Sequence, residues 1–246
     1  MKKQLLYSMI AFSLISTGLP HLASARLEPT SSAMLTLTEP QGWNAGLRLR
    51  RDRREFQIGP ETDKLDIDQA TFRLGFAPLS FINVWAEAGV VRAEDIQEKA
   101  STGLQWGVGA YARIFELPID SSPVVGHKRT IAGGVEVTYT ESESNFDNAD
   151  FDWSELRLSP LASYIQNRKG DLRWFNYGPE GIAVHGGPIF IRNSGTLDGS
   201  TVREKSDIGA RVVFDILWAS GWVTSFDGSF IGDSERQLSL GFSKNF

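Results

Sequence analysis

The sequence predicts an all-β fold, because residues of alternating polarity recur along most of the 246-residue chain. Alternation gives a strand one apolar face and one polar face. Residues 208–218 and 222–230 repeat the pattern and are separated by only a short turn. The final strand shows it most clearly, with one parity occupied by Leu238, Leu240, Phe242 and Phe246.

Two further features indicate that these strands cross a membrane as a closed antiparallel barrel. The polar parity carries Arg211, Asp215 and Asp227 in mid-strand, which indicates a polar or ion-paired interior. Trp218 and Trp222 flank the turn on the apolar parity, and membrane interfaces favour aromatic rings. Because lipid offers no hydrogen-bond partner to an open sheet edge, such a sheet must close on itself.

The carboxy-terminal residue, Phe246, follows apolar residues at alternate positions. Together with the alternation and the tryptophan pair, this ending resembles that of small bacterial outer-membrane β-barrel proteins. The resemblance is to the class and to no particular member. It implies a transmembrane up-and-down barrel in the outer membrane of a Gram-negative bacterium, in contact with outer-membrane lipid. It also implies that Phe246 is an assembly signal read by the barrel-assembly machinery during insertion.

Residues 1–25 have the pattern of a cleaved signal peptide that exports the chain. Lys2 and Lys3 form a basic start, an apolar centre follows at 5–19, and Ala23-Ser24-Ala25 is a small-residue cleavage site. A membrane anchor is the alternative, but the apolar centre is short. The predicted domains are therefore a signal peptide at 1–25, a short periplasmic segment at 26–41 and a barrel at 42–246.

The composition excludes several classes of protein. Cleavage after Ala25 removes two lysines and no acids, leaving 221 residues with a formal net charge of −7. Such a chain lacks the basic surface that nucleic-acid binding requires. It has no cysteine, which excludes disulfides and thiolate metal sites. After the signal, the longest uncharged stretches, 74–86 and 100–112, are too short for the about 20 apolar residues of a spanning helix.

The pattern predicts ten strands, with eight as the alternative if the region 172–192 and one neighbour are misassigned. Region 172–192 contains several glycines and prolines, so a bulge or kink is expected in its strand. Long polar connections are expected after the first, third, fifth and seventh strands, and short turns after the second, fourth, sixth and eighth. The predicted connections include polar loops at 51–66, 92–101, 141–152 and 193–205, and a turn at 117–128.

The inward parity of these strands collects charged residues of both signs. They could select a small solute in a weak porin-like lumen, or they could form ion pairs that fill the interior of a narrow barrel. The near balance of signs favours ion pairs, since buried charges are tolerated when they are paired, and it predicts little or no conductance. The predicted lumen-facing residues are Arg48, Arg50, Arg73, Glu87, Arg113, Glu136, Glu155, Arg157, Arg211, Asp215 and Asp227.

An outer-membrane hydrolase acting on lipid or peptide is the second interpretation. A nucleophilic site would need a histidine beside a serine or an acid, and only His127 and His185 follow the signal. His185 precedes Asn193-Ser194-Gly195, but the stretch lacks the compact His-x-Ser-Asn order of barrel phospholipases. The sequence therefore favours a barrel that is not an enzyme. A secreted soluble β-sandwich binding protein is a third alternative.

Metal and cofactor sites are not indicated. Two histidines without a third ligand at recognisable spacing do not make a zinc site. The acidic stretch 141–150 lacks the ligand spacing of a helix-loop-helix calcium site. We therefore assign no catalytic, cofactor-binding or metal-binding residue, no cofactor and no nucleic-acid partner; the solute, if there is one, is unknown.

Overall fold

The computed structural model describes residues 42–58, 61–95, 101–122, 127–146, 149–168, 179–197, 200–204, 207–218, 221–232 and 235–246. The predicted signal peptide and the segment 26–41 lie outside the described residues. Within the described parts, all pairings between strands are antiparallel. The strands are β1 Trp43–Ile58, β2 Glu61–Leu79, β3 Ile82–Asp95, β4 Ser101–Ser122, β5 His127–Phe146, β6 Ala149–Arg168, β7 Pro179–Leu197, β8 Ser200–Glu204, β9 Ile208–Trp218, β10 Trp222–Ile231 and β11 Glu235–Asn245.

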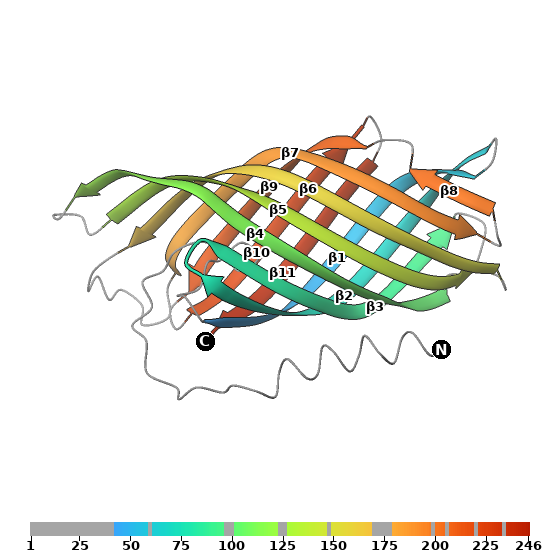
Figure 1. The fold of residues 1–246 in the computed structure, drawn as a ribbon, viewed down its shortest axis with the longest axis horizontal. Coiled ribbons are helices and arrows are strands. Elements are labelled where there is room, and N and C mark those ends of the chain that lie inside the picture. Colours follow the sequence, from blue (N-terminus) through green and yellow to red (C-terminus); the bar gives the residue numbers. More distant parts are fainter. Residues whose placement is uncertain are drawn as a thin grey trace.

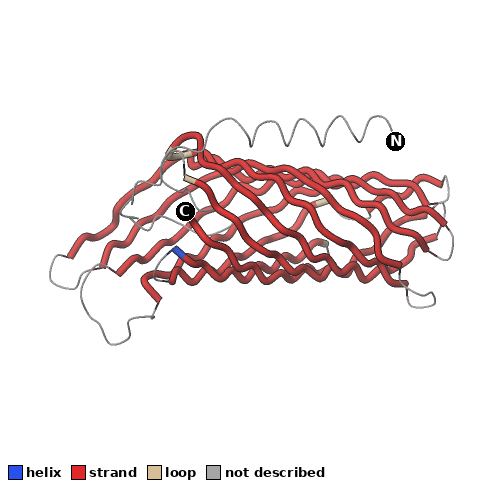
Figure 2. The backbone as a smooth tube through the Cα atoms, turned by 90° about the horizontal axis from the view of Figure 1, so that it is seen from below, coloured by secondary structure: helices blue, strands red, loops and turns tan. Residues whose placement is uncertain are grey.

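The sheet closes because β1 pairs with β2 along one edge and with β11 along the other. Leu47 lies opposite Phe242 in this seam, and the Phe246 backbone N–H donates to the Trp43 carbonyl at 2.8 Å. The strands run obliquely around a single cylinder (Figures 1 and 2). The ten-stranded barrel predicted from the sequence is therefore confirmed, and the β-sandwich alternative is wrong.

One short strand, β8, was not predicted. β9, β10 and β11 are only 10 or 11 residues long, whereas β1 to β7 have 14 to 22. Beyond the shorter strands, β8 pairs with the end of β7 and the end of β1. The wall thus has ten strands at the end where Trp43 and Phe246 lie, which we call the terminal end. At the opposite far end, it closes with the eight strands β1 to β8.

Several segments predicted as loops are instead ends of strands. β1 continues to Ile58 and β2 begins at Glu61, so most of 51–66 is paired. The described residues of 92–101, 117–128, 141–152 and 193–205 also belong to strands. These segments lose the apolar alternation because their outer side chains are polar, yet their backbones remain paired. The predicted pattern of long and short connections is therefore wrong: the longest interval between strands, 169–178, follows β6 at the terminal end.

The bulge or kink predicted for the strand in region 172–192 is present near the start of β7, whereas the pairing of β7 with β6 is regular. Leu158 lies opposite Phe190 and Ala162 opposite Gly186, so β6 and β7 keep one register across Pro160 and Pro188. Both prolines lack the N–H that a ladder needs, which explains the missing pairs between these points. The register of β7 against β9 shifts between Pro179 and Gly181, which lie within the predicted region.

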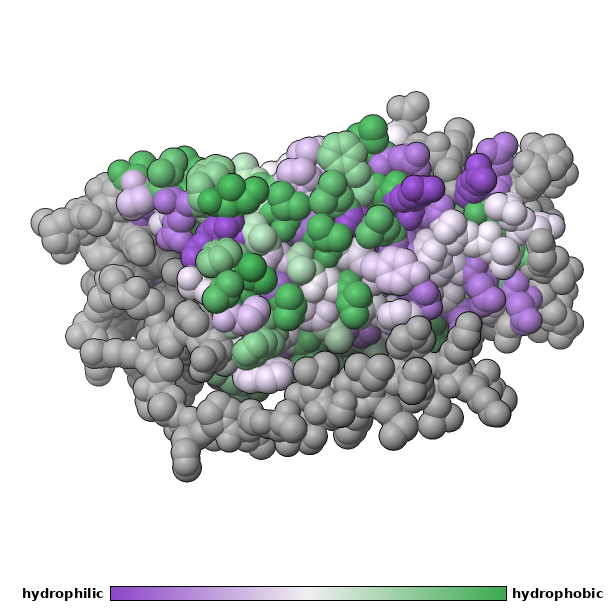
Figure 3. Space-filling model, in the orientation of Figure 1, coloured by the Kyte–Doolittle hydropathy of each residue, from purple (hydrophilic) through white to green (hydrophobic). Residues whose placement is uncertain are grey.

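The outer wall is apolar over the middle of the barrel. Leu47, Phe72 and Val212 are more than half exposed there, as lipid contact would require. Figure 3 shows hydrophobic side chains over the middle of the wall and hydrophilic ones toward the end with β8. At the terminal end, Trp43 packs on Phe76 with ring centroids 4.8 Å apart. Among the described residues, no helix has the length and hydrophobicity needed to cross a bilayer.

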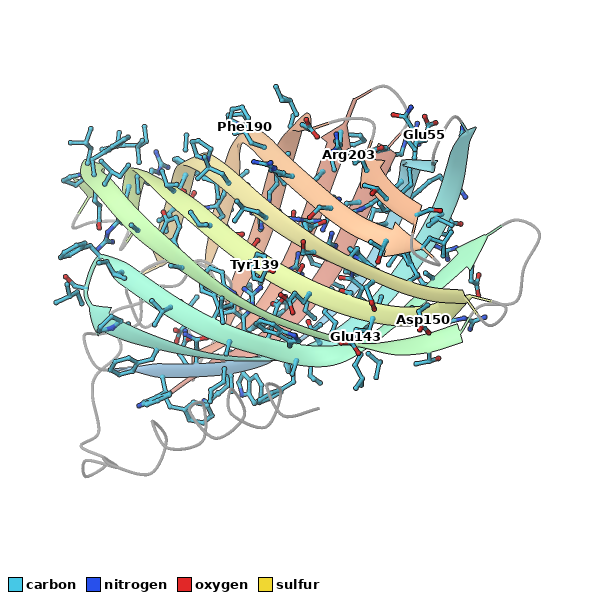
Figure 4. All side chains as sticks on the ribbon, turned by 45° about the vertical axis from the view of Figure 1, so that its right-hand side comes forward. Glu55, Tyr139, Glu143, Asp150, Phe190 and Arg203 are labelled. Atoms are coloured by element: carbon cyan, nitrogen blue, oxygen red, sulfur yellow. The ribbon has the colours of Figure 1, made fainter. Side chains whose placement is uncertain are left out.

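Charged side chains lie where this apolar band ends, on the side toward the far end of the barrel. On β1 the outward side chains change from Leu49 to Arg51 and Arg53, and Arg53 Nε donates to Asp66 Oδ1 at 2.9 Å. This hydrogen bond lowers the pKa of Asp66 below its ordinary value. Figure 4 shows Glu143 and Arg203 toward the far end, with the aromatic residue Tyr139 nearer the middle.

We predict that Leu47→Arg destabilises the folded barrel in lipid vesicles by about 2–4 kcal/mol, because it places a cation within the apolar band. Thr196→Arg, on the outer face near the far end, should cost no more than about 1 kcal/mol. Urea titrations of folding in vesicles measure both values. Equal, small costs would contradict the position of the lipid-facing band.

We predict that deleting Phe246 impairs assembly, because the last residue pairs with Trp43 where the barrel closes. Phe246→Tyr, which retains the backbone and an aromatic ring, should assemble normally. Heat-modifiable migration on gels and surface exposure in cells measure assembly. Unchanged migration and exposure after the deletion would show that Phe246 is not an assembly signal.

Candidate functional site in the barrel interior

Ten of the eleven predicted lumen-facing residues are buried inside the barrel, each less than 9% exposed. Their strands place them in successive layers, because residues two apart on one strand point to the same side. The exception is Arg113, which lies beside a register shift in β4. Its guanidinium is only partly buried, contacts Glu116 and donates to the Ser80 carbonyl at 3.0 Å.

The first network of ion pairs comprises Arg48, Glu136, Arg211 and Asp227. Arg211 donates through Nη1 to Glu136 at 2.8 Å and through Nε and Nη2 to both oxygens of Asp227 at 3.1 and 2.9 Å. Arg48 Nη2 lies 3.6 Å from the same Asp227 carboxylate. Because Glu136 is on β5 and Asp227 is on β10, Arg211 links two strands that are not adjacent in the sheet.

Arg73 on β2 and Glu87 on β3 form a separate ion pair at about the same position along the barrel axis as the first network. The two residues are directly opposite in register, and Arg73 Nη2 donates to Glu87 at 2.8 Å. The guanidinium carbon also lies 4.6 Å from the centroid of the Trp85 ring. Gly109, across from Trp85, leaves room for that ring, since a Cβ there would approach it to 2.4 Å.

The second network lies nearer the far end and comprises Arg50, Asp52, Arg54, Glu155 and Arg157. Asp52 binds Arg50 at 2.5 Å and Arg54 at 2.9 Å, and Glu155 contacts all three arginines. Arg157 also donates to Gln237 at 2.7 Å. Sequence analysis missed Asp52 and Arg54, because it ended the first strand before them. Their alternation with exposed Arg51 and Arg53 was the signal that could have found them.

Beyond the second network, the eight-stranded section encloses an apolar plug. The Phe151 ring stacks on Trp153 at 4.6 Å between centroids and meets Phe56 edge-on at 6.0 Å. These aromatic side chains are buried inside the wall, so apolar side chains fill much of the far end of the lumen. The plug consists of Phe56, Leu65, Ile67, Val91, Ala93, Phe151, Trp153 and Val202, with Leu197 packed against it.

A different polar group lies near the terminal end on three neighbouring strands. Ser163 on β6 is directly opposite His185 on β7, and its Oγ lies 2.6 Å from His185 Nδ1. His185 Nε2 lies 3.0 Å from Asp215 Oδ2 on β9. All three side chains are less than 5% exposed. Sequence analysis examined His185 but considered the wrong serine, since Ser194 is exposed and pairs with Ser154.

The described residues contain no cluster of three or more His, Asp or Glu side chains arranged to hold a metal ion. The side chain of His127 lies outside those described. The acidic segment considered for calcium belongs to the paired ends of β5 and β6. A small cavity of about 10 Å³ adjoins Arg48 and Arg73, and is large enough for about one water molecule.

Comparison with known proteins gives structural similarity only; no family model and no curated sequence matches the chain. The translocator domain of the autotransporter NalP from Neisseria meningitidis is 12% identical, with a TM-score of 0.42 over 85% of this chain and 90% of that one. An outer membrane channel from Pseudomonas putida F1 is 8% identical, with a TM-score of 0.41 over 89% and 100%. Neisserial surface protein A is 9% identical, with a TM-score of 0.33 over 83% and 97%.

We predict that Arg73→Met destabilises the barrel by about 3–5 kcal/mol, because it leaves the Glu87 carboxylate buried without its ion-pair partner. The double variant Arg73→Met, Glu87→Gln should recover part of this loss. Arg53→Met, which breaks the exposed pair with Asp66, should cost less than about 1 kcal/mol. Urea unfolding of the refolded proteins measures all three, and equal costs at the buried and exposed pairs would contradict burial of the lumen charges.

Proposed function

We propose that this protein is an integral outer-membrane barrel with a closed lumen, and that its role is structural or at most weakly porin-like. The observation that carries this proposal is the pairing of the interior charges. Six arginines, at positions 48, 50, 54, 73, 157 and 211, lie in the lumen, and each contacts at least one buried carboxylate. Charges that line an open aqueous channel would instead remain hydrated.

The dimensions of the barrel support the same proposal. A barrel of about eight strands has room for side chains or one small ligand, whereas open aqueous channels occur at about sixteen strands. This wall has ten strands at the terminal end and eight at the far end. Two levels of ion pairs and the apolar plug follow one another along the lumen, so an ion would have to displace paired charges and then cross hydrocarbon.

The apolar outer band supports placement in a membrane, and the predicted signal peptide supports export to the outer membrane. Because the barrel has an even number of wall strands, both of its ends lie at one rim. We place this terminal end in the periplasm and the β8 end outside the cell. The partners that follow are outer-membrane lipid around the band and the assembly machinery during insertion.

We predict that the refolded mature protein gives no step-like conductance in a planar lipid bilayer, because the lumen is closed at several levels. Single-channel recording in concentrated potassium chloride tests this, with a sixteen-stranded porin in the same bilayer as the positive control. Brief, low-conductance events would agree with a weak porin-like role. Stable open channels of porin-like conductance would contradict the proposal.

A further inference from the structure

We propose that Ser163, His185 and Asp215 form a nucleophilic catalytic site that hydrolyses small esters. The three side chains make a continuous chain of contacts, from the serine hydroxyl through both ring nitrogens to the carboxylate, at 2.6 and 3.0 Å. This activity goes beyond the proposed structural role. It also does not depend on whether the lumen conducts.

The register of the sheet builds this arrangement. Ser163 and His185 face each other directly across β6 and β7. Asp215 on β9 is opposite Ala183, two residues from His185, so its carboxylate reaches the imidazole diagonally. All three residues have inward parity, and no residue of the two ion networks contacts them through a hydrogen bond within the described structure.

The roles follow from the hydrogen-bonding capacity of a neutral imidazole, which has one N–H donor and one acceptor. With its proton on Nε2, His185 donates to Asp215, and Nδ1 is free to accept the Ser163 hydroxyl proton. Asp215 is therefore a positioning residue that fixes this tautomer. Ser163 is the nucleophile and His185 its general base.

The reaction needs only an ester and water. Ser163 Oγ bonds to the carbonyl carbon as its proton moves to His185 Nδ1; the bond to the alcohol then breaks, and the alcohol takes that proton. Water next attacks the acyl-serine and gives a proton to His185 Nδ1. The bond between Oγ and the acyl carbon breaks, the proton returns to Ser163, and a carboxylic acid is released.

The surroundings of the group are apolar. Trp85, Tyr111 and Leu161 form an apolar cluster next to the group. Asp215 lies three residues before the end of β9, on the order of 10 Å from the terminal rim. The substrates of the proposed reaction are short-chain esters that reach the group from this rim.

A fluorophosphonate probe tests the site on the refolded, full mature chain, because it reacts only with an activated serine. The covalent label adds a known mass, so mass spectrometry of the peptides identifies the labelled residue. Phenylmethanesulfonyl fluoride serves as a second, smaller probe. We expect both probes to label Ser163. His185→Gln should slow labelling roughly 10²-fold or more, while Asp215→Asn should slow it as well.

The matched control is Ser159→Ala, which removes another buried, inward serine of β6 and should leave labelling unchanged. Ser163→Ala should abolish labelling and the hydrolysis of p-nitrophenyl acetate, while heat-modifiable migration shows that the barrel remains folded. Failure of both probes to label folded native protein would overturn the proposal. So would labelling at an equal rate in His185→Gln, which would show that the contacts are structural only.

Discussion

The hydrogen-bonded seam between β1 and β11 is the feature on which the rest of the structure depends. In lipid, an unpaired strand edge would leave its N–H and C=O groups without partners, so the sheet is viable only as a closed wall. Closure in turn gives every wall strand one face toward lipid and one toward the lumen. The apolar outer band, the paired interior charges and the Ser163, His185 and Asp215 group are all consequences of that division.

The interior resolves a second problem, which is how a narrow barrel accommodates many charged side chains. A single buried charge would be costly, but each interior arginine is close to a carboxylate on the same strand, on a neighbouring strand or across the lumen. Arg211 shows the principle, since it contacts acids on two separate strands. At the far end the interior is apolar and is not filled by ion pairs. There β8 reduces the wall to eight strands, and aromatic side chains fill the smaller cross-section.

The sequence was informative wherever lipid imposes alternation. It predicted the ten wall strands and the inward parity of residues such as Arg48 and Glu136, because in these segments an error of one residue would place charges in lipid. Outside the apolar band that constraint disappears, so the sequence predicts loops where the structure has polar strand ends. Asp52, Arg54 and β8 were missed for this reason.

The Ser163 group was missed for a different reason. Its three residues are at least 22 positions apart, and only the register between β6, β7 and β9 brings them together. Alternation fixes which face a side chain occupies but not which residue it meets on the next strand. Prolines and glycines also blurred the pattern around His185, so its inward orientation could not be recognised from the sequence.

The most direct test of the account is the environment of adjacent residues on one strand pair. Because the chain has no cysteine, single cysteines at Val137, Thr138, Leu158 and Ser159 can each carry one nitroxide label in the barrel refolded into vesicles. The account predicts that labels at Val137 and Leu158 collide readily with oxygen dissolved in the lipid, whereas labels at Thr138 and Ser159 are shielded. Equal accessibility at neighbouring positions, or the reverse order, would contradict a lipid-facing outer wall around a closed lumen.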